Sequence, residues 1–255
     1  IKIKGDNMDI NALKEQFTKY VYTYDILDEE IAKKYYHSLR VMDISRQIAL
    51  DNKLSSIDIE LASIIGLLHD YSRFEQWDKF HTYNDTLSID HGDLAILRLF
   101  KEYEIKKYYS KEIYYDIIYD AIKYHNKYTY PKDLKKSNDL HCKIIRDADK
   151  LDILQMGIST ASLKDEECSI SQTVSKLFFE NKPIDYHYTT NKNETIILYL
   201  AMIFDLNYTY SYRYLKEHQI IEKIYAPIKN KSKFKKYFDH INKYVDERID
   251  ENVRN

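Results

Sequence analysis

Glycine, proline and cysteine are all scarce in this chain of 255 residues, and each shortage excludes a class of structure. Four glycines and three prolines leave few tight turns, which argues against a β-sandwich or barrel and favours long helices. Two cysteines, Cys142 and Cys168, form no C-x-x-C motif and are too few for a disulfide framework. We therefore expect reduced thiols and a helical fold.

Long apolar runs and an excess of charge of one sign are also missing. No stretch approaches the ~18 apolar residues that a membrane span needs, and the N-terminus lacks the profile of a signal peptide. The net charge of −2 provides no basic field for nucleic acid. We expect a cytoplasmic protein with no membrane partner and no strong nucleic-acid signal, and a homo-oligomer is left open.

Helical periodicity is what the chain does contain, from Asp28 onward. Asp28 is suited to cap a helix over residues 29–50, and Ser55 with Asp58 resembles a capping box. Ser88 and Ser110 are further candidate caps. The other expected helices cover residues 57–70, 89–103, 111–125, 139–156 (ending at Gly157), 167–180, 194–215 and 232–249.

These patterns predict an all-α, single-domain helical bundle with additional C-terminal helices. We divide the chain into an N-terminal segment (1–27), a core (28–157) and a C-terminal helical extension (158–255) that packs on the core.

Histidine and aspartate recur at or near the ends of the expected helices. His69 and Asp70 are adjacent at the end of one helix, and His37, His91 and His125 belong to three others. Taken singly, a histidine in a helix is more often a surface residue or a satisfied core residue than a metal ligand. Together, imidazole and carboxylate groups on converging helix ends suit Fe, Mn or Zn, and the lack of thiolates argues against a structural zinc site.

From about Tyr35 to Gly157 the sequence resembles the HD-domain metal-dependent phosphohydrolases. That family combines a histidine, an adjacent His-Asp pair and a distant aspartate on a helical scaffold. The matching stretches are "YYHSLRV" with His37, "LLHDYSRF" with His69 and Asp70, and "IIRDADKLD". Arg73 stands three residues after the aspartate of the pair, where the family often has a basic residue.

His91 in "SIDHGDL" and His125 in "AIKYHNKY" resemble the extra histidines of two-metal members, although they are also open to interpretation as polar helix-end residues. The resemblance then implies two divalent transition-metal ions as cofactors: Fe, Mn, Co or Zn, with Ni or Mg as further options. The Gly-Tyr-Pro signature of cyclic-di-GMP enzymes is missing, which argues against that substrate.

Two aspartates compete to be the last ligand. Asp147 and Asp149 lie about 200° apart around a helix, so only one can face the site. The Ala-Asp-Lys-Leu context of the family favours Asp149, with Asp152 on the same face, and Asp147 remains the alternative.

The resemblance implies a phosphohydrolase (a phosphodiesterase or a nucleotide phosphatase or pyrophosphatase) that cleaves a phosphate ester or anhydride of a nucleotide-like substrate by a metal-bridged hydroxide. Asp70 would bridge the metals, and Arg73 would hold phosphate and stabilise the transition state. Lys150 and His81 are further substrate-binding candidates, each also interpretable as an ordinary surface residue. Glu75 is a candidate proton donor to the leaving group.

Two other classes of function compete with the enzyme. One is a non-catalytic HD-fold module that binds nucleotide or metal as a sensor, which the complete set of ligand positions disfavours. The other is an interaction protein that uses residues 194–215 to bind a partner. The apolar residues of that segment run nearly all round, which fits a buried core helix better.

Overall fold

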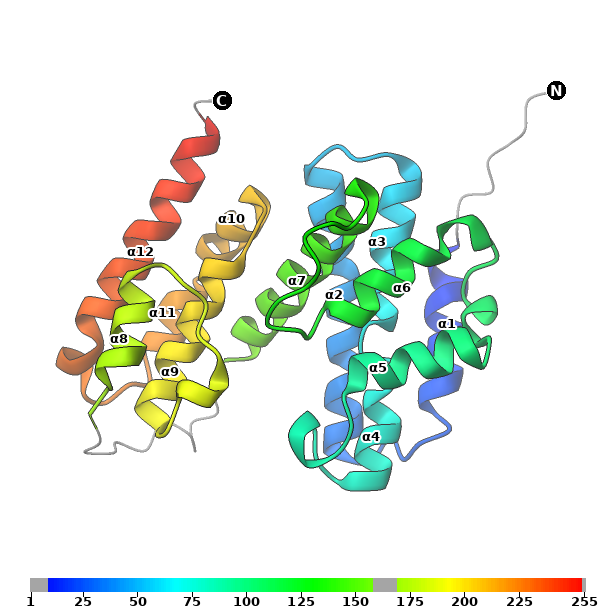
Figure 1. Cartoon of the computed structure of the whole chain (residues 1–255), viewed down its shortest axis with the longest axis horizontal. Helices are drawn as coiled ribbons and strands as arrows, with labels where there is room; N and C mark the ends of the chain where they lie inside the picture. The colour runs from blue at the N-terminus through cyan, green and yellow to red at the C-terminus, as the bar shows by residue number, and fades with distance from the viewer. Residues whose placement is uncertain (1–8, 158–168, 254–255) are drawn as a thin grey trace. The chain divides into compact units, whose positions relative to one another are not determined.

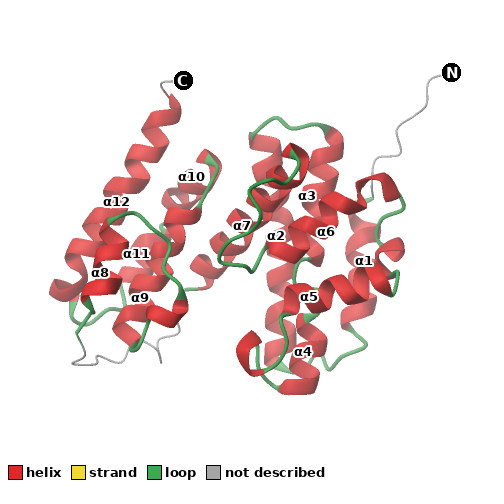
Figure 2. Cartoon of the chain, in the orientation of Figure 1, coloured by secondary structure: helices red, strands yellow, loops and turns green. Residues whose placement is uncertain are grey.

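The structure, a computed structural model, describes residues 9–157 and 169–253 (Figure 1). No β-strand occurs within these ranges, which confirms the all-α prediction (Figure 2). The chain divides into two compact units between Ala148 and Asp149, inside one unbroken helix, and earlier than the boundary expected after residue 157. None of the described helices is both long and apolar enough to cross a membrane.

The first unit consists of short and long helices joined by 3₁₀ turns and one π-helical turn. Its main elements are α1 (Ile10–Val21), α2 (Glu29–Asp51), α3 (Ser56–Leu68), α4 (Arg73–Phe80), α5 (His91–Ile96), α6 (Tyr115–Tyr124) and the first part of α7 (Lys136–Met156). The second unit contains the end of α7, followed by α8 (Gln172–Phe179), α9 (Lys192–Ala201), α10 (Thr209–Glu217), α11 (Ile220–Tyr225) and α12 (Lys231–Val253).

The helices α2 and α3 pack side by side at the centre of the first unit (Figure 1). Every residue of α3 from Leu61 to Leu68 is buried, so this helix is enclosed by its neighbours rather than amphipathic. Both predicted caps are confirmed, because the Asp28 carboxylate accepts from the first amides of α2 and the Ser55 hydroxyl accepts from the amide of Asp58. These caps fix where α2 and α3 begin.

The caps expected at Ser88 and Ser110 are wrong. The Ser88 hydroxyl donates to the carbonyl of Asn84 at 2.9 Å, and Asp90 caps α5 instead, accepting from the amide of Asp93 at 2.9 Å. The helix expected after Ser110 starts later, because a 3₁₀ turn precedes α6.

The helix expected over residues 194–215 is broken in the middle. After α9 the chain makes a 3₁₀ turn over Met202–Asp205, and Leu206 is extended before α10 begins. The Asn207 side chain donates to the carbonyl of Asp205 at 3.0 Å, and the Tyr212 hydroxyl donates to that of Leu206 at 2.7 Å. These side chains satisfy backbone groups locally and so compete with a continuous helix.

Gly66 allows α3 to approach α2 closely. A Cβ atom at this position would lie 2.8 Å from both the Cα of Met42 and the Oγ of Ser45, and 2.9 Å from the carbonyl oxygen of Val41. Two of these three contacts are to backbone atoms, which cannot move aside as a flexible side chain can. The close approach therefore requires glycine.

We predict that Gly66→Ala destabilises the protein although alanine is the better helix former. The helix propensity gain is about 1 kcal/mol, whereas overpacking a tight core typically costs about 1–3 kcal/mol, and backbone contacts belong at or above the upper end. Urea denaturation should therefore show a net loss in the free energy of unfolding. Ser63→Ala on the same helix is the control and should change it far less; a Gly66→Ala protein as stable as the wild type would contradict the close packing.

Candidate metal centre

Helices of the first unit bring their ends together around Asp70. His37 lies inside α2, His69 and Asp70 directly follow α3, His91 is the first residue of α5, and His125 directly follows α6. All five side chains are buried. A turn in which the amide of Tyr71 donates to the carbonyl of Leu68 at 3.0 Å ends α3 and directs the His-Asp pair inward.

The two carboxylate oxygens of Asp70 face different histidine pairs. Its Oδ2 lies 3.4 Å from the Nε2 of His37 and 3.6 Å from that of His69. Its Oδ1 lies 3.4 Å from the Nε2 of His91 and 3.7 Å from that of His125. Asp70 therefore stands between two sets of nitrogen ligands, with one oxygen for each.

The residues that meet the spacing of a metal site form three overlapping groups. The ligand atoms within each group lie within 4.8 Å of one another. The groups are His37, His69 and Asp70; Asp70, His91 and His125; and His69, His125 and Asp149. Together they contain all six residues that the sequence analysis named as ligands, whereas Asp147 is buried but belongs to none of these groups.

Backbone carbonyls set the orientation of two of the rings. The Nδ1 of His69 donates to the carbonyl of Gly66 at 2.8 Å, and the Nδ1 of His125 donates to that of Ile122 at 2.7 Å. A carbonyl can only accept, so each Nδ1 carries a proton and each neutral ring has its lone pair on Nε2. The free carbonyl in the last turn of a helix thus directs a histidine that follows it towards the centre.

Asp85 orients a third ring, and the sequence analysis missed it. Its Oδ2 lies 2.6 Å from the Nδ1 of His91, so the opposite nitrogen, Nε2, points at Asp70. This arrangement of carboxylate, imidazole and metal site is the usual way to fix a ligand histidine. Burial, together with the positive charge of Arg73, lowers the pKa of His91 to about 4 against the opposing effect of Asp85. His91 is therefore neutral near pH 7, as a metal ligand must be.

The Nε2 atoms of His91 and His125 present two facing lone pairs that a cation can satisfy together. The Nε2 atoms of His91 and His125 are 2.9 Å apart, and those of His37 and His69 are 3.2 Å apart. In the neutral rings of His91 and His125 the two Nε2 atoms are both acceptors, since each Nδ1 already donates elsewhere. Two facing lone pairs beside a carboxylate oxygen are the donor set of a divalent metal ion, so the residues fit such an ion.

Two basic side chains compensate the buried charge of Asp70. The Nζ of Lys34 donates to Oδ2 at 2.8 Å, and the Nε of Arg73 lies 3.4 Å from Oδ1. Burial alone would raise the pKa of Asp70, but nearby groups, with Lys34 foremost and Arg73 among them, outweigh it and hold the pKa well below its usual value. Lys34 was also missed from the sequence; its position three residues before His37, on the same face of the helix, was the available signal.

Arg73 lies beside the centre as expected, with much of its guanidinium group already engaged. Its NH1 donates to the carbonyl of Tyr83 at 2.8 Å and to Asp85 at 3.0 Å. Its Nε is buried and has no hydrogen-bond partner among the described residues. That donor lies next to Asp70, where an anion bound at the centre could accept from it.

The other two predicted substrate-binding residues occupy different surroundings. Lys150 forms an ion pair with Asp205 at 2.8 Å, within the second unit. His81 is exposed at the end of α4, in a left-handed conformation with a φ of 49°, and its ring contacts the edge of Trp77. Substrate contact by either residue stays a prediction.

The expectation that Glu75 donates a proton is wrong. Its carboxylate accepts from the Nε of Arg98 at 2.7 Å, from the NH2 of Arg98 at 2.6 Å and from Lys79 at 2.6 Å. The hydrogen bonds from Arg98 lower the pKa of Glu75 to about 2. A carboxyl group with so low a pKa is ionised near pH 7, which argues against Glu75 as a proton donor.

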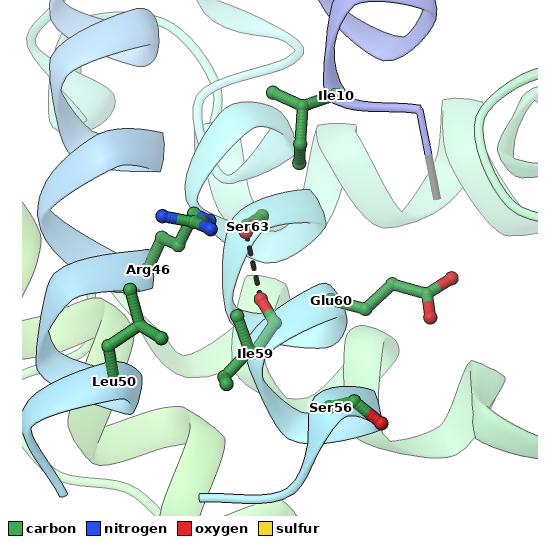
Figure 3. A pocket seen from close by; sticks show the side chains of 7 residues that line it. All are labelled: Ile10, Arg46, Leu50, Ser56, Ile59, Glu60 and Ser63. Atoms are coloured by element: carbon green, nitrogen blue, oxygen red, sulfur yellow. Dashed lines mark hydrogen bonds between the residues drawn. The ribbon is translucent and has the colours of Figure 1, made fainter. Parts of the chain in front are cut away.

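A separate pocket of about 240 Å³ lies between α1, α2 and α3 (Figure 3). Its lining includes Ile10, Arg46 and Glu60, and a hydrogen bond from the Ser63 hydroxyl to the carbonyl of Ile59 closes one wall. None of the candidate metal ligands lines it. The metal centre and this pocket are therefore different features of the same helices.

The comparison with known families agrees with this geometry. Residues 35–154 match the family described as HD domain. This stretch begins inside α2, two residues before His37, and ends inside α7, the helix that carries Asp149. Neither the curated proteins nor the solved structures give a match to the chain. The match marks residues 35–154 as similar to the HD domain, which suggests the superfamily of metal-dependent hydrolases, and the clustered histidines and aspartates fit divalent metal binding.

We predict that Glu75→Gln lowers stability without shifting the pH profile of any hydrolytic activity. The glutamine keeps the shape but removes the charge that pairs with Arg98, at a cost of about 1–2 kcal/mol. Because the folded pKa lies below the usual value of about 4.3, this contribution is present above pH ~4.3 and is lost as pH falls towards 2. Chemical denaturation at pH 7 and pH 3 measures it, and an activity profile altered on its acidic limb would restore Glu75 as a proton donor.

Proposed function

We propose that this protein is a metal-dependent phosphohydrolase that cleaves a phosphate ester or anhydride of a nucleotide-like substrate at a centre for two divalent transition-metal ions. The observation that carries the proposal is the position of Asp70, whose two oxygens each face a different pair of histidine Nε2 atoms. A carboxylate placed in this way suits a ligand shared by two ions.

The residues divide into two ligand sets. His37 and His69 with the Oδ2 of Asp70 would hold one ion, and His91 and His125 with its Oδ1 would hold the other. The sequence context assigns Asp149 to the first ion, and its carboxylate lies near His69 and His125, one member of each pair. Imidazole and carboxylate ligands suit Fe, Mn, Co or Zn.

When bound, divalent ions supply an acidified water molecule and polarise the phosphoryl group. The protein supplies the positions and the charges around them. The Nε of Arg73 and the Nζ of Lys34 lie on opposite oxygens of Asp70, so an anion at the centre would meet a cation on either side. These two donors favour a phosphate over a neutral substrate.

The alternative is a sensor that binds nucleotide or metal without turnover. The two functions share the same ligands, so only release of product separates them. Screening nucleotides and phosphate esters with Mn²⁺, Fe²⁺ or Co²⁺ for phosphate release tests the proposal. Tight binding without release of product for every substrate would favour the sensor. A cytoplasmic location and a homo-oligomeric state stay predictions.

We predict that protein purified without chelators carries about two metal ions per chain. The double variant His91→Ala/His125→Ala should carry about one, because the set around His37 and His69 remains. Elemental analysis measures the stoichiometry. Asp149→Ala should lose metal, whereas Asp147→Ala is the matched control on the same helix and should retain it. A wild-type content near one that the double variant does not change would leave a mononuclear centre.

We predict that removing either cation lowers turnover without loss of metal. Arg73→Ala should lower kcat/KM by roughly 10²–10³-fold, the usual effect of removing a donor that stabilises the transition state, with metal content unchanged. Lys34→Ala should also lower kcat/KM, while metal binding stays equal or tightens, because the ammonium competes for the same oxygen of Asp70.

Lys33→Ala is the matched control for Lys34, since Lys33 is its neighbour on α2 with an exposed side chain paired to Glu30. It should leave both quantities unchanged. If metal is lost when Lys34 is removed, the lysine supports the fold of the centre and does not serve the substrate.

A further inference from the structure

Asp85 lies outside all three groups of candidate ligands and yet contacts both halves of the proposed machinery. It begins a short 3₁₀ turn over Asp85–Leu87, in the loop that joins α4 to α5. Its side chain is three-quarters buried, with 25% of its surface exposed. Neither the ligand motif nor the helical pattern of the sequence marks it.

The carboxylate of Asp85 divides its two oxygens between different donors. Its Oδ2 accepts from the Nδ1 of His91 at 2.6 Å and from the side-chain amide of Asn126 at 3.2 Å. Its Oδ1 accepts from the NH1 of Arg73 at 3.0 Å and from the Nε2 of Gln76 at 3.0 Å. These donors fill the acceptor sites of an ionised carboxylate, and no neutral group could serve all four.

These contacts fix the tautomer of His91 and the orientation of Arg73, both of which the proposed reaction needs. The bond to His91 keeps the ring proton on Nδ1, so that Nε2 presents its lone pair 3.4 Å from Asp70. The bond to Arg73 holds the guanidinium with its Nε 3.4 Å from the same oxygen, Oδ1 of Asp70. A displacement of Asp85 would therefore move the candidate metal ligand His91 and the guanidinium of Arg73 together.

We propose that Asp85 is a positioning residue that couples the second metal site, at His91 and His125, to Arg73, the hydrogen-bond donor for a bound anion. This inference rests on the proposed function for the roles of His91 and Arg73. Asp85 touches neither reacting group itself, and it acts by setting the tautomer of one side chain and the orientation of another. Occupancy of the second site and affinity for a phosphate would then depend on one carboxylate.

The loop has enough other hydrogen bonds to survive an isosteric change at Asp85. Gln76 also donates to the hydroxyl of Ser88 at 2.8 Å and to the carbonyl of Ile89 at 3.0 Å. The Ser88 hydroxyl donates in turn to the carbonyl of Asn84 at 2.9 Å. Asp85→Asn should therefore fold, and the effect of the substitution should be on the centre.

An amide at this position can satisfy only one of the two sides. Arginine cannot stop donating, whereas a histidine can change tautomer, so the amide oxygen should turn to Arg73 and the amide nitrogen to His91. His91 must then accept on Nδ1 and carry its proton on Nε2, which blocks that nitrogen as a ligand. We expect Asp85→Asn to lower the metal content from about two ions per chain to about one.

The tautomer is measured directly in the full-length, metal-free protein by long-range ¹H–¹⁵N NMR of the histidine rings. His91 should show a protonated Nδ1 in the wild type and a protonated Nε2 in Asp85→Asn. Titration with inorganic phosphate in the Mn²⁺-loaded proteins should show at least a tenfold weaker affinity for Asp85→Ala, which leaves Arg73 without this partner. A purely structural role would not move the tautomer.

Asp93→Asn is the matched control, because Asp93 lies in the first turn of α5 with 56% of its side chain exposed and a Lys127 partner at 3.4 Å. It should keep the wild-type metal content and tautomer. Asp85→Asn with an unchanged His91 tautomer and unchanged metal content overturns the inference. If the tautomer and metal content change as expected but no substrate is hydrolysed by the wild type, the proposed function fails and the positioning role of Asp85 stands.

Discussion

A buried carboxylate between two histidine pairs is the constraint on which the rest of this structure depends. Asp70 is only 2% exposed, and a charge in such a place must be compensated. Its Oδ2 faces His37 and His69, its Oδ1 faces His91 and His125, and Lys34 and Arg73 lie close to the two oxygens. The helices that supply these groups must end or pass within a few ångströms of one residue. The tight packing of α3 on α2 at Gly66 is one consequence.

The surroundings of the histidines explain why helix ends build this centre. In the last turn of an α-helix the carbonyls have no amide partner within the helix. His69 and His125 use such carbonyls, from Gly66 and Ile122, to hold their Nδ1 protons. His91 begins its helix, where amides rather than carbonyls are free, so it needs a side-chain acceptor from elsewhere, and Asp85 provides it. The polarity of the helix thus determines which histidine depends on another residue.

The charged groups around the centre differ between Asp70 and Glu75. Lys34 and Arg73 make the region next to Asp70 suitable for an anion, whereas the carboxylate of Glu75 is paired with Arg98 and Lys79. Hydrogen bonds from Arg73 and Gln76 tie the loop between α4 and α5 to the same carboxylate that orients His91. The candidate metal ligand His91 and Arg73, the hydrogen-bond donor for an anion, therefore belong to one hydrogen-bonded network, which is the physical basis for coupling between them.

The sequence by itself determined the all-α class, the caps at Asp28 and Ser55, the end of α7 at Gly157 and the HD-domain motif, because each depends on neighbours within a few residues or on a linear pattern. It also named six ligand candidates that the structure gathers into overlapping groups. Only the tertiary structure decided the rest. The bonds of Lys34 to Asp70, of Asp85 to His91 and of Glu75 to Arg98 arise from contacts that loops and packed helices create, and spacing along the chain does not encode them. The break after α9 and the cap at Asp90 depend on local side-chain bonds that the helical pattern does not reveal. Lys34 and Asp70 are 36 residues apart, and the ion pair between them exists only once α2 and α3 have packed.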